Sequence, residues 1–395
     1  MAKVKDIAMQ IRGVSYHPED LHDNLDEDSV ILLRANNIKD GKLILDDVVY
    51  VSKSKVAEQQ YLQTGDILIC ASSGSKELVG KAAFVDSVKN PMTFGAFCKV
   101  VRPQPEYSEY LEHYFNSPVY RRKISALSAG ANINNIKNEH IDNLDIQLVD
   151  EKERREIITI LNELNMLISL RKQQLFKLDE LVKARFVEMF GDPINNPMKW
   201  IVSKIEDIAA QEKNALKAGP FGSALKKEFY VKSGYKIYGQ EQVICGDASF
   251  GDYYIDEEKY KELKNCAVQA GDILISLVGT YGKTLIMPDN YEAGIINPRL
   301  MKITLNKNKV KPIYFKYYFE SDALKASMDA NTHGGTMGIL NLGIIRQMKI
   351  QVPPLSIQNQ FAAFVERVNQ QKQTVQQSLE KLELIKKALM QECFG

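Results

Sequence analysis

The sequence has little that would support a disulfide scaffold, a metal centre or membrane insertion. Its 395 residues include only five cysteines, with no Cys-x-x-Cys pair, and five scattered histidines. Neither a disulfide framework nor a structural metal site is therefore expected. No apolar run approaches the roughly 20 residues of a membrane helix, and no apolar signal stretch follows Met1. These absences favour a chain that works in the reduced cytoplasm, away from membranes.

An excess of one charge is also lacking, because the formal net charge is only +1 at pH 7. Residues 1–150 carry 17 Lys and Arg against 21 Asp and Glu, and residues 191–354 carry 21 against 18. Neither segment has the basic excess of a protein that coats nucleic acid without sequence preference. Any contact with DNA would depend on local basic loops or on a partner.

Motifs for catalysis are missing as well. The segment 279–284 resembles the end of a phosphate-binding loop, but Leu277 stands where that motif needs glycine. Glu257 and Glu258 are better explained as part of a solvated turn than as metal ligands. Asn297-Pro298-Arg299 lacks the second proline and the aromatic residue of an amino-methyltransferase loop, and residues 94–97 are too short for a methyl-donor fingerprint. The sequence therefore predicts a non-enzymatic protein without a cofactor.

Two long helices dominate what is present. Asp150 and Glu153 resemble a capping box, and Gly191 followed by Pro193 is typical of a helix end. Apolar residues recur every seven positions between these signals and again near the end of the chain, which predicts a buried helical seam in each segment. The predicted seam residues are Leu161, Ile168, Leu175 and Val182 in the first helix and Phe361, Val368, Val375, Leu382 and Leu389 in the second.

The chain is a tandem duplication. Leu175 and Leu379, like Phe190 and Phe394, are 204 residues apart. Gly65-Asp66-Ile67-Leu68-Ile69 is matched by 271–275, and each segment predicts a turn that leads into a buried strand. Ser29–Leu33 is expected to be a strand, and Asp40-Gly41 is expected to be the hairpin turn between that strand and Leu43–Leu45. Residues 110–120 and 314–324 are expected to form helices. Gly13, Gly219 and Gly222 are interpreted as turn glycines.

Each half thus predicts a mixed α/β globule followed by a helix of about 40 residues, which would span roughly 60 Å. Such a helix cannot bury its stripe on one small domain, so it must pair with another helix. We favour antiparallel pairing within the chain, which would relate the globules by an approximate two-fold axis. Pairing with another copy of the chain is the alternative. Arg171 and Arg185 interrupt a second apolar row, and we interpret them as flanking the seam with their aliphatic stems. The alternative is that they are polar seam positions that fix the register of the helices.

Several stretches together resemble the specificity subunits of type I restriction–modification systems. They are Leu33–Ile38 with Asp40-Gly41, the two Gly-Asp-Ile-Leu-Ile strands, Gly219–Ser223, Ile296–Leu300 and Phe190–Pro193. The resemblance implies an α/β (α+β) fold in which two target recognition domains are separated by two long antiparallel helices that form a coiled coil. The implied segments are residues 1–149 and 192–354 for the domains, and 150–191 and 355–395 for the helices.

The same resemblance implies a DNA-binding subunit that reads a bipartite, asymmetric target in double-stranded DNA. Its implied partners are two methyltransferase subunits, which carry the adenine chemistry, and restriction subunits, which translocate and cleave DNA. A coiled-coil scaffold without DNA contact is the alternative function. Ser, Asn, Lys, Tyr and Gly recur at matching loop positions of both halves, which favours DNA binding.

The DNA-contacting residues are expected among polar loop side chains that suit phosphates or base edges. The residues chosen on this ground are Arg12, Ser15, Tyr16, Ser73, Lys76, Asn132 and Asn134 in the first half and Ser223, Lys226, Lys227, Tyr281, Lys283, His333 and Thr336 in the second.

Overall fold

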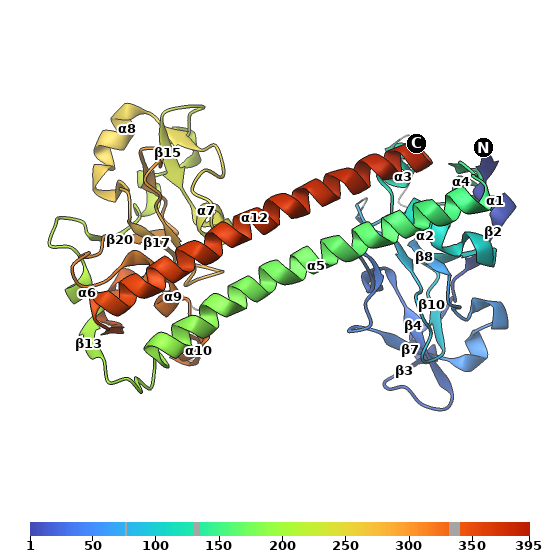
Figure 1. The fold of residues 1–395 in the computed structure, drawn as a ribbon, viewed down its shortest axis with the longest axis horizontal. Coiled ribbons are helices and arrows are strands. Elements are labelled where there is room, and N and C mark those ends of the chain that lie inside the picture. Colours follow the sequence, from blue (N-terminus) through green and yellow to red (C-terminus); the bar gives the residue numbers. More distant parts are fainter. Residues whose placement is uncertain (76, 130–134, 332–339) are drawn as a thin grey trace. The chain divides into compact units, whose positions relative to one another are not determined.

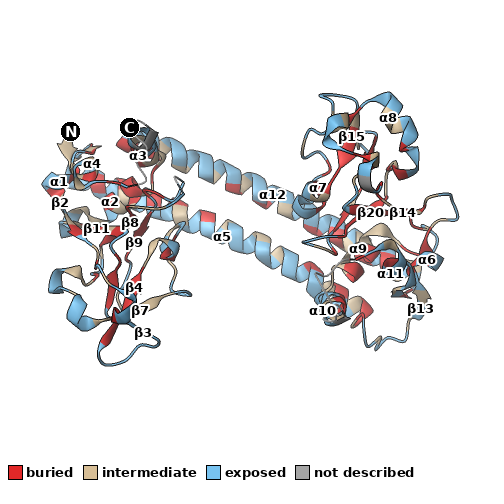
Figure 2. Ribbon diagram, turned by 180° about the vertical axis from the view of Figure 1, so that it is seen from behind, coloured by how far each residue is buried: buried red, intermediate tan, exposed pale blue. Residues whose placement is uncertain are grey.

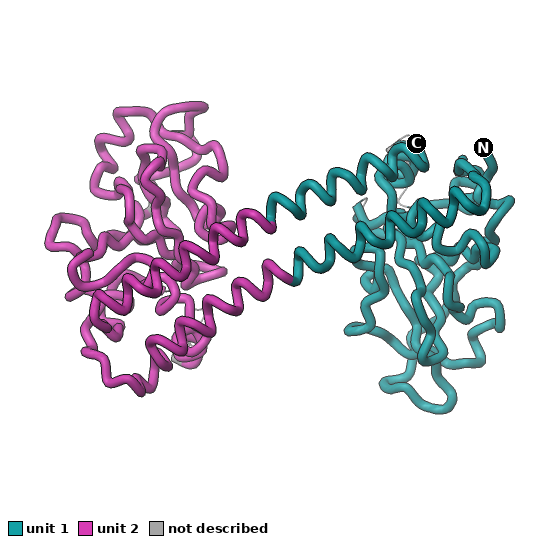
Figure 3. Tube along the Cα trace, in the orientation of Figure 1, with its two compact units in different colours: residues 1–173, 376–395 teal, residues 174–375 magenta. Residues whose placement is uncertain are grey.

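The computed structural model describes residues 1–75, 77–129, 135–331 and 340–395, and it divides into two compact units (Figure 3). Unit 1 comprises residues 1–173 and 376–395, and unit 2 comprises residues 174–375. Each unit contains one globule and a part of each long helix. The four segments inferred from the sequence cut the chain at the helix ends instead, and they remain a prediction.

Unit 1 is built on a six-stranded sheet of order β2-β11-β8-β9-β6-β5 and a four-stranded sheet of order β10-β4-β7-β3. A short pair, β1 and β12, completes its strands. The strands are β1 (Ala2–Lys3), β2 (Ala8–Arg12), β3 (Leu21–His22), β4 (Ser29–Leu33), β5 (Ile38–Lys39), β6 (Gly41–Leu43), β7 (Val49–Ser52), β8 (Ile67–Cys70), β9 (Ala82–Phe84), β10 (Met92–Phe94), β11 (Cys98–Pro103) and β12 (Asp145–Ile146). Its short helices are α1 (Val4–Ile7), α2 (Ser108–Phe115), α3 (Pro118–Ala129) and α4 (Asn138–Asp142).

Unit 2 repeats this plan with a four-stranded sheet of order β14-β20-β17-β18, a three-stranded sheet of order β16-β15-β19 and the pair β13-β21. The strands are β13 (Ile201–Lys204), β14 (Leu216–Ala218), β15 (Tyr235–Tyr238), β16 (Tyr254–Ile255), β17 (Ile273–Ser276), β18 (Thr284–Ile286), β19 (Gly294–Ile296), β20 (Leu300–Ile303) and β21 (Lys349–Val352). Its short helices are α6 (Ile205–Ile208), α7 (Gln240–Cys245), α8 (Glu257–Glu262), α9 (Pro312–Phe319), α10 (Asp322–Asn331) and α11 (Leu342–Gln347).

The repeated strands form as the sequence predicts. Every residue of β8 and β17, the two Ile-Leu-Ile strands, is buried, and each strand pairs antiparallel with an equivalent neighbour, β11 or β20. Asp40 and Gly41 both have positive φ, at 51° and 78°, as a tight hairpin turn requires. The hairpin is confirmed, but its first strand is β5, not the predicted Ser29–Leu33.

Two helices that we predicted as continuous are each broken in two. The first breaks between α2 and α3 and the second between α9 and α10. In both places a serine hydroxyl accepts the amide of the new first turn, from Tyr120 to Ser117 at 3.1 Å and from Leu324 to Ser321 at 3.4 Å. Apolar residues continue through both breaks, so the hydrophobic pattern does not reveal them, whereas the serine caps do.

The two long helices, α5 (Glu151–Phe190) and α12 (Leu355–Phe394), each have 40 residues, and their bounds differ by the 204 residues of the repeat (Figure 1). The predicted start of α5 is confirmed, because the Asp150 carboxylate accepts the amide of Glu153 at 2.9 Å. Its end is confirmed too, because Gly191 adopts a left-handed conformation with φ of 78°.

Within each unit the two helices run antiparallel. In unit 1, Lys172 forms an ion pair with Glu383 at 3.0 Å, and Met390 packs in the same core as Leu161. In unit 2, Lys372 pairs with Asp179 at 2.5 Å. Buried residues follow one face of each helix (Figure 2). Of the nine predicted seam residues, Leu161, Ile168, Val182, Phe361, Val368 and Val375 are buried, and Leu175, Leu382 and Leu389 are partly buried.

The two arginines beside the seam are only partly buried. Arg171 donates from Nε to the Ser378 hydroxyl at 3.2 Å, and Arg185 pairs with Glu188 while its guanidinium lies 5.8 Å from the centre of the Phe364 ring. These positions fit the interpretation of Arg171 and Arg185 as flanking residues.

Candidate DNA interface

A close approach of two backbone segments organises the candidate interface of each unit. In unit 1, a Cβ atom on Gly13 would lie 2.1 Å from the carbonyl oxygen of Gly95. In unit 2, a Cβ on Gly219 would lie 1.9 Å from the carbonyl oxygen of Asn297. Only glycine allows these approaches. Interpreting Gly13 and Gly219 as turn glycines was therefore wrong, because neither has a left-handed φ and both are needed for space.

Each crossing lies where two parallel strands end side by side. In unit 1 these strands are β4 and β10, and in unit 2 they are β15 and β19. The amide of Gly95 donates to Leu33 at 2.9 Å, and that of Asn297 donates to Tyr238 at 2.9 Å. We call Gly13 and the ends of β4 and β10 the loop junction of unit 1, and Gly219 and the ends of β15 and β19 the loop junction of unit 2.

A buried side chain holds the exit of the first parallel strand in both units. Asn37 accepts the amide of Arg34 at 2.8 Å, and Gln242 accepts the amide of Gly239 at 2.8 Å. Both side chains are buried, and each also donates to a backbone carbonyl. These contacts fix the backbone from which the junction side chains project, since a buried amide group must satisfy all of its polar atoms.

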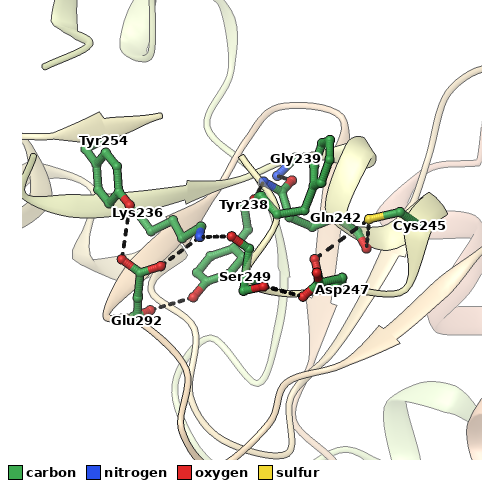
Figure 4. A network of polar contacts seen from close by, with 10 residues as sticks. Lys236, Tyr238, Gly239, Gln242, Cys245, Asp247, Ser249, Tyr254 and Glu292 are labelled. Carbon is green, nitrogen blue, oxygen red and sulfur yellow. Dashed lines mark hydrogen bonds and ion pairs between the residues drawn. The ribbon is translucent and has the colours of Figure 1, made fainter. Parts of the chain in front are cut away.

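A wider polar network supports this exit in unit 2 (Figure 4). Lys236 on β15 is only 1% exposed, and its ammonium donates to the carbonyl of Ser249 at 2.8 Å and to Glu292 at 2.7 Å. The ion pair with Lys236 is the main cause that lowers the pKa of Glu292. The Tyr238 hydroxyl donates to the carbonyl of Glu292 at 2.6 Å. The network therefore ties β15 to the segments that follow α7 and precede β19.

The junction of unit 1 opens into a basic groove of about 870 Å³. Arg12 at the end of β2 lies directly opposite Lys99 on β11. Burial is the main cause that lowers the pKa of Lys99, and the nearby Arg12 lowers it further. The groove is lined in part by the cations Lys5, Arg12, Lys99 and Lys137 and by the acids Glu139 and Asp142. Cations outnumber acids, so the groove suits a phosphate backbone.

The sequence-based choices in unit 1 divide into three groups. Arg12 and Ser15 line the basic groove and are exposed. Tyr16 is partly buried beside Gly95. The Ser73 hydroxyl accepts the amide of Ser75 at 3.2 Å. Both side chains therefore make contacts within the protein. Lys76, Asn132 and Asn134 lie outside the described residues.

The choices in unit 2 are more scattered. Ser223, Lys226 and Lys227 are exposed in the segment after the crossing glycine, and Lys226 pairs with Glu228 at 3.4 Å. Tyr281 donates its hydroxyl to Asp329 and, with Lys283, lines a small cavity of about 130 Å³. Across the described part of unit 2, no hydrogen bond or ion pair joins the two sets. His333 and Thr336 lie outside the described residues.

Sequence reasoning missed three exposed junction residues, Phe97, Phe221 and Arg299. Phe97 and Arg299 occupy equivalent positions. The carbonyl of Phe97 accepts the amide of Ala71, the first residue after β8, and the carbonyl of Arg299 accepts the amide of Leu277, the first residue after β17, both at 2.9 Å. Phe221 follows Gly219 by two residues, as Ser15 follows Gly13. An alignment of the two halves on these glycines pairs Phe221 with Ser15 and would have pointed to Phe221, but it does not pair Phe97 with Arg299.

Other kinds of site receive no support from the described residues. Over residues 1–75, 77–129, 135–331 and 340–395, no group of three or more His, Cys, Asp or Glu side chains could hold a metal ion. None of the helices in these ranges is long and apolar enough to cross a membrane.

Comparisons with known proteins agree on one family. The model of the type I restriction modification DNA specificity domain matches residues 197–384. The EcoKI specificity subunit of Escherichia coli is 30% identical over 390 residues, which cover 93% of this chain and 81% of that protein. The StySPI specificity subunit of Salmonella potsdam is 27% identical over 395 residues, with the same shares of both chains covered.

Solved structures show the same fold. A chain from a study of the assembly and conformational transition of a type I restriction–modification system has a TM-score of 0.61 at 15% identity and covers 99% of this chain and 96% of its own. The S subunit from M. genitalium has a TM-score of 0.51 at 14% identity and covers 100% and 95%. The EcoKI relative, in agreement with the matching family model, establishes that this chain belongs to the specificity subunits of type I restriction–modification systems.

Proposed function

We propose that this chain recognises a bipartite, asymmetric sequence in double-stranded DNA, one part through the loop junction of each unit. The observation that carries the proposal is the duplicated junction. The same backbone crossing at Gly13 and Gly219 supports different exposed side chains, Ser15 and Phe97 in unit 1 and Phe221 and Arg299 in unit 2. Equivalent scaffolds with different side chains would read different bases, because base edges are distinguished by side-chain chemistry.

The reading units are proposed to be residues 1–149 and 192–354, with 150–191 and 355–395 as the connecting helices. The relatives are named as specificity subunits of type I restriction enzymes, which supports partners of two kinds, methyltransferase and restriction subunits. The chain itself selects the target, and its partners carry the chemistry. We place it in the cytoplasm, in keeping with cysteines that are all free.

Methylation mapping tests the target. A genome modified by this chain with its partner methyltransferase should carry methyl groups in one two-part sequence. Replacement of residues 1–149 by the matching segment of a relative should change one part and leave the other intact. Replacement of residues 192–354 is the matched control and should change the other part alone. If either exchange altered both parts, the proposal of two separate readers would be wrong.

The number of methyltransferase subunits is tested by mass. Because the Phe190 and Phe394 helix ends are repeated, two similar binding sites and hence two subunits are expected. Native mass spectrometry of the assembled complex should give two methyltransferase subunits for each copy of this chain. A stable complex with one subunit would contradict this stoichiometry without affecting the proposed target.

A further inference from the structure

Two phenyl rings project into solvent from the loop junctions. Phe97 of unit 1 is 71% exposed, and Phe221 of unit 2 is 86% exposed. A single exposed apolar side chain is ordinary on a protein surface. These two differ from the ordinary case because each follows, by two residues, a glycine of the backbone crossing in its own unit, Gly95 for Phe97 and Gly219 for Phe221.

The two junctions exchange the position of their aromatic residue. Phe97 follows the exit of β10, and its equivalent in unit 2 is Arg299. Phe221 follows the crossing glycine after β14, and its equivalent in unit 1 is Ser15. Each junction therefore presents one phenyl ring and one polar or cationic side chain, with the two places exchanged.

The backbone that carries each ring is held by hydrogen bonds. The carbonyl of Phe97 accepts the amides of Ala71 at 2.9 Å and Ser72 at 3.0 Å. The Cys98 amide donates to Gly95 at 2.8 Å, which closes the turn around Phe97. Near Phe221, the Gly219 amide donates to Leu300 at 2.9 Å, and the carbonyl of Phe221 accepts the amide of Ala224 at 3.2 Å. A ring on such a backbone loses little further freedom on binding.

The surroundings of the rings suit DNA better than a protein surface. Ala96, next to Phe97, lines the groove that also contains Arg12 and Lys99. The Phe221 segment crosses the loop that contains Arg299, and Ser223 follows it. A protein-binding site usually has an apolar centre from which charged residues are depleted. An isolated ring among cations matches proteins that insert apolar wedges between base steps while basic side chains hold the phosphates.

We propose that Phe97 and Phe221 insert between neighbouring bases of the DNA target, one ring in each part of the sequence. This inference rests on the proposed function and names the residues that deform the DNA. The phosphates would be held beside Phe97 by Arg12 and beside Phe221 by Arg299. Each ring would favour a base step that unstacks easily, so sequence would be read there through deformability as well as through base edges.

The test uses the full chain assembled with its methyltransferase subunits and duplexes of the mapped target. Single adenines along both parts are replaced by 2-aminopurine, whose fluorescence rises when it is unstacked. Phe97→Ala and Phe221→Ala are the test variants, and Phe97→Trp keeps an aromatic face. Phe176→Ala is the matched control, because Phe176 is 66% exposed on α5, outside both junctions. For every variant the affinity is measured by titration, the fluorescence is compared at saturating protein, and the fold is checked by thermal melting.

Phe97→Ala should weaken target binding roughly 5- to 150-fold, the range for loss of one base–aromatic contact. It should also abolish the fluorescence rise at one base step in one part of the target only. Phe221→Ala should do the same in the other part. Phe97→Trp should keep most of the affinity and the fluorescence signal, and Phe176→Ala should bind as the unmodified chain does.

Three results would overturn the inference. If both alanine variants bind the target with unchanged affinity and fluorescence, the rings do not enter DNA. If DNA binding by the assembled complex is unchanged but assembly with the methyltransferase fails, the rings contact protein instead. If the unmodified complex shows no preference for the mapped target over random duplex, the proposed function fails first. Only this last result concerns the unmodified chain, so the two failures can be distinguished.

Discussion

Each unit has a buried aspartate at the same position of the repeat, and the two carboxylates have different cationic partners. Asp66 and Asp272 each follow the glycine of the repeated turn, and each accepts the amide of the residue three positions earlier, Gln63 at 2.8 Å and Gln269 at 3.0 Å. In unit 1, Arg102 donates to Asp66 from Nε and Nη2, both at 2.8 Å. The two units thus share the carboxylate and its backbone partner.

The cation of unit 2 comes from a different place on the equivalent strand. Lys302 on β20 donates to Asp272 at 2.9 Å, and Thr304 donates from its hydroxyl at 2.5 Å. The strand pairing shows which residues are equivalent. Cys98 lies opposite Cys70 in unit 1, and Leu300 lies opposite Ser276 at the end of the equivalent strand in unit 2. Arg102 is the fourth residue after Cys98 and Thr304 is the fourth after Leu300, so Thr304, not Lys302, is the equivalent of Arg102. The fold requires a cation near the carboxylate but not a particular residue, since an unpaired buried charge is what destabilises it.

The largest expected effect is on the pair in unit 2. Lys302→Ala leaves Asp272, which is 0% exposed, without its cation, and should lower the free energy of unfolding of unit 2 by about 3–5 kcal/mol. Arg102→Ala should cost unit 1 less, about 1.5–3 kcal/mol, because the Arg102 side chain is 16% exposed, against 7% for Lys302, so water can more easily fill the space that the arginine leaves.

Hydrogen–deuterium exchange of peptides from each unit measures this difference in the full chain. The control is Lys264→Ala, which removes an exposed lysine from the same unit as Lys302. Equal exchange in the Lys302→Ala variant and the unmodified chain would show that Thr304 and the Gln269 amide suffice for Asp272.

The next effect concerns the crossing glycine of unit 1. In Gly13→Ala the new Cβ would meet a backbone carbonyl at 2.1 Å, and backbone cannot move aside as a side chain can. We expect a loss of about 1–3 kcal/mol in the stability of unit 1, as for other overpacked sites. Gly74→Ala is the matched control, because nothing lies within 4 Å of its added Cβ.

The effect of Gly13→Ala on recognition is measured by binding to DNA duplexes in which one part of the target or the other is changed. Gly13→Ala should weaken recognition of one part of the DNA target and leave recognition of the other part unchanged. A Gly13→Ala chain that is as stable as Gly74→Ala would mean that the crossing loops can separate without cost.

A smaller expected effect is a pH dependence of the stability of unit 1, caused by a helix position at which the two units have different residues. Glu112 on α2 and Lys316 on α9 are equivalent, 204 residues apart. Burial, followed by the nearby Asp86 and Glu109, raises the pKa of Glu112 to about 7. Lys316 instead pairs with Glu320 at 3.0 Å. At this helix position, unit 1 therefore has a carboxyl group that is more easily ionised after unfolding, and unit 2 has a lysine instead.

The sign follows from the direction of this shift. The pKa of Glu112 is higher in the folded chain than in the unfolded one, so its contribution to stability is full below about pH 4.5 and is lost as the pH rises to about 7. The slope is at most about 1.4 kcal/mol per pH unit. Exchange of unit 1 peptides should therefore become faster from pH 5 to pH 7, after correction for intrinsic exchange, and Glu112→Gln should remove the dependence. The same dependence in unit 2 would point to another group.

The sequence predicts well what depends on local periodicity or on direct repetition. The seven-residue spacing reveals the long helices, because Leu161 and Ile168 must share one helix face. The repeated Gly-Asp-Ile-Leu-Ile segment reveals the duplication. By contrast, the hydrophobic pattern does not show the breaks before Pro118 and Asp322, since apolar residues such as Tyr114 and Tyr120 pack in the same core on both sides of the first break.

The candidate site was predicted only in part, because it is assembled from distant segments. Arg12 and Ser15 flank a glycine in a polar loop, which is a local signal. Phe97 carries no such signal, since its importance depends on a crossing that involves Gly13, more than 80 residues earlier. Lys99 belongs to the groove only because β11 pairs with β2 in a register that brings it opposite Arg12.

The smallest effect concerns a contact that the duplication has kept unchanged. Tyr110 on α2 donates its hydroxyl to the carbonyl of Gln147 at 2.9 Å, and Tyr314 on α9 donates to that of Gln351 at 2.8 Å. Each ring also packs against the phenylalanine that ends a long helix, with centroids 5.1 Å apart for Tyr110 and Phe394 and 4.7 Å apart for Tyr314 and Phe190.

Removing the two hydroxyls should nevertheless have unequal costs. Gln147 is exposed, so water can replace the hydroxyl in Tyr110→Phe, whereas Gln351 is only 3% exposed and its carbonyl would lose a buried donor in Tyr314→Phe. We expect losses of about 0.5 kcal/mol in unit 1 and about 1.5 kcal/mol in unit 2, the two ends of the range for one hydrogen bond. Exchange of the peptides around α2 and α9 measures both. Since the rings and the phenylalanine contacts remain in both variants, equal losses would mean that the exposure of the acceptor does not set the strength of this contact.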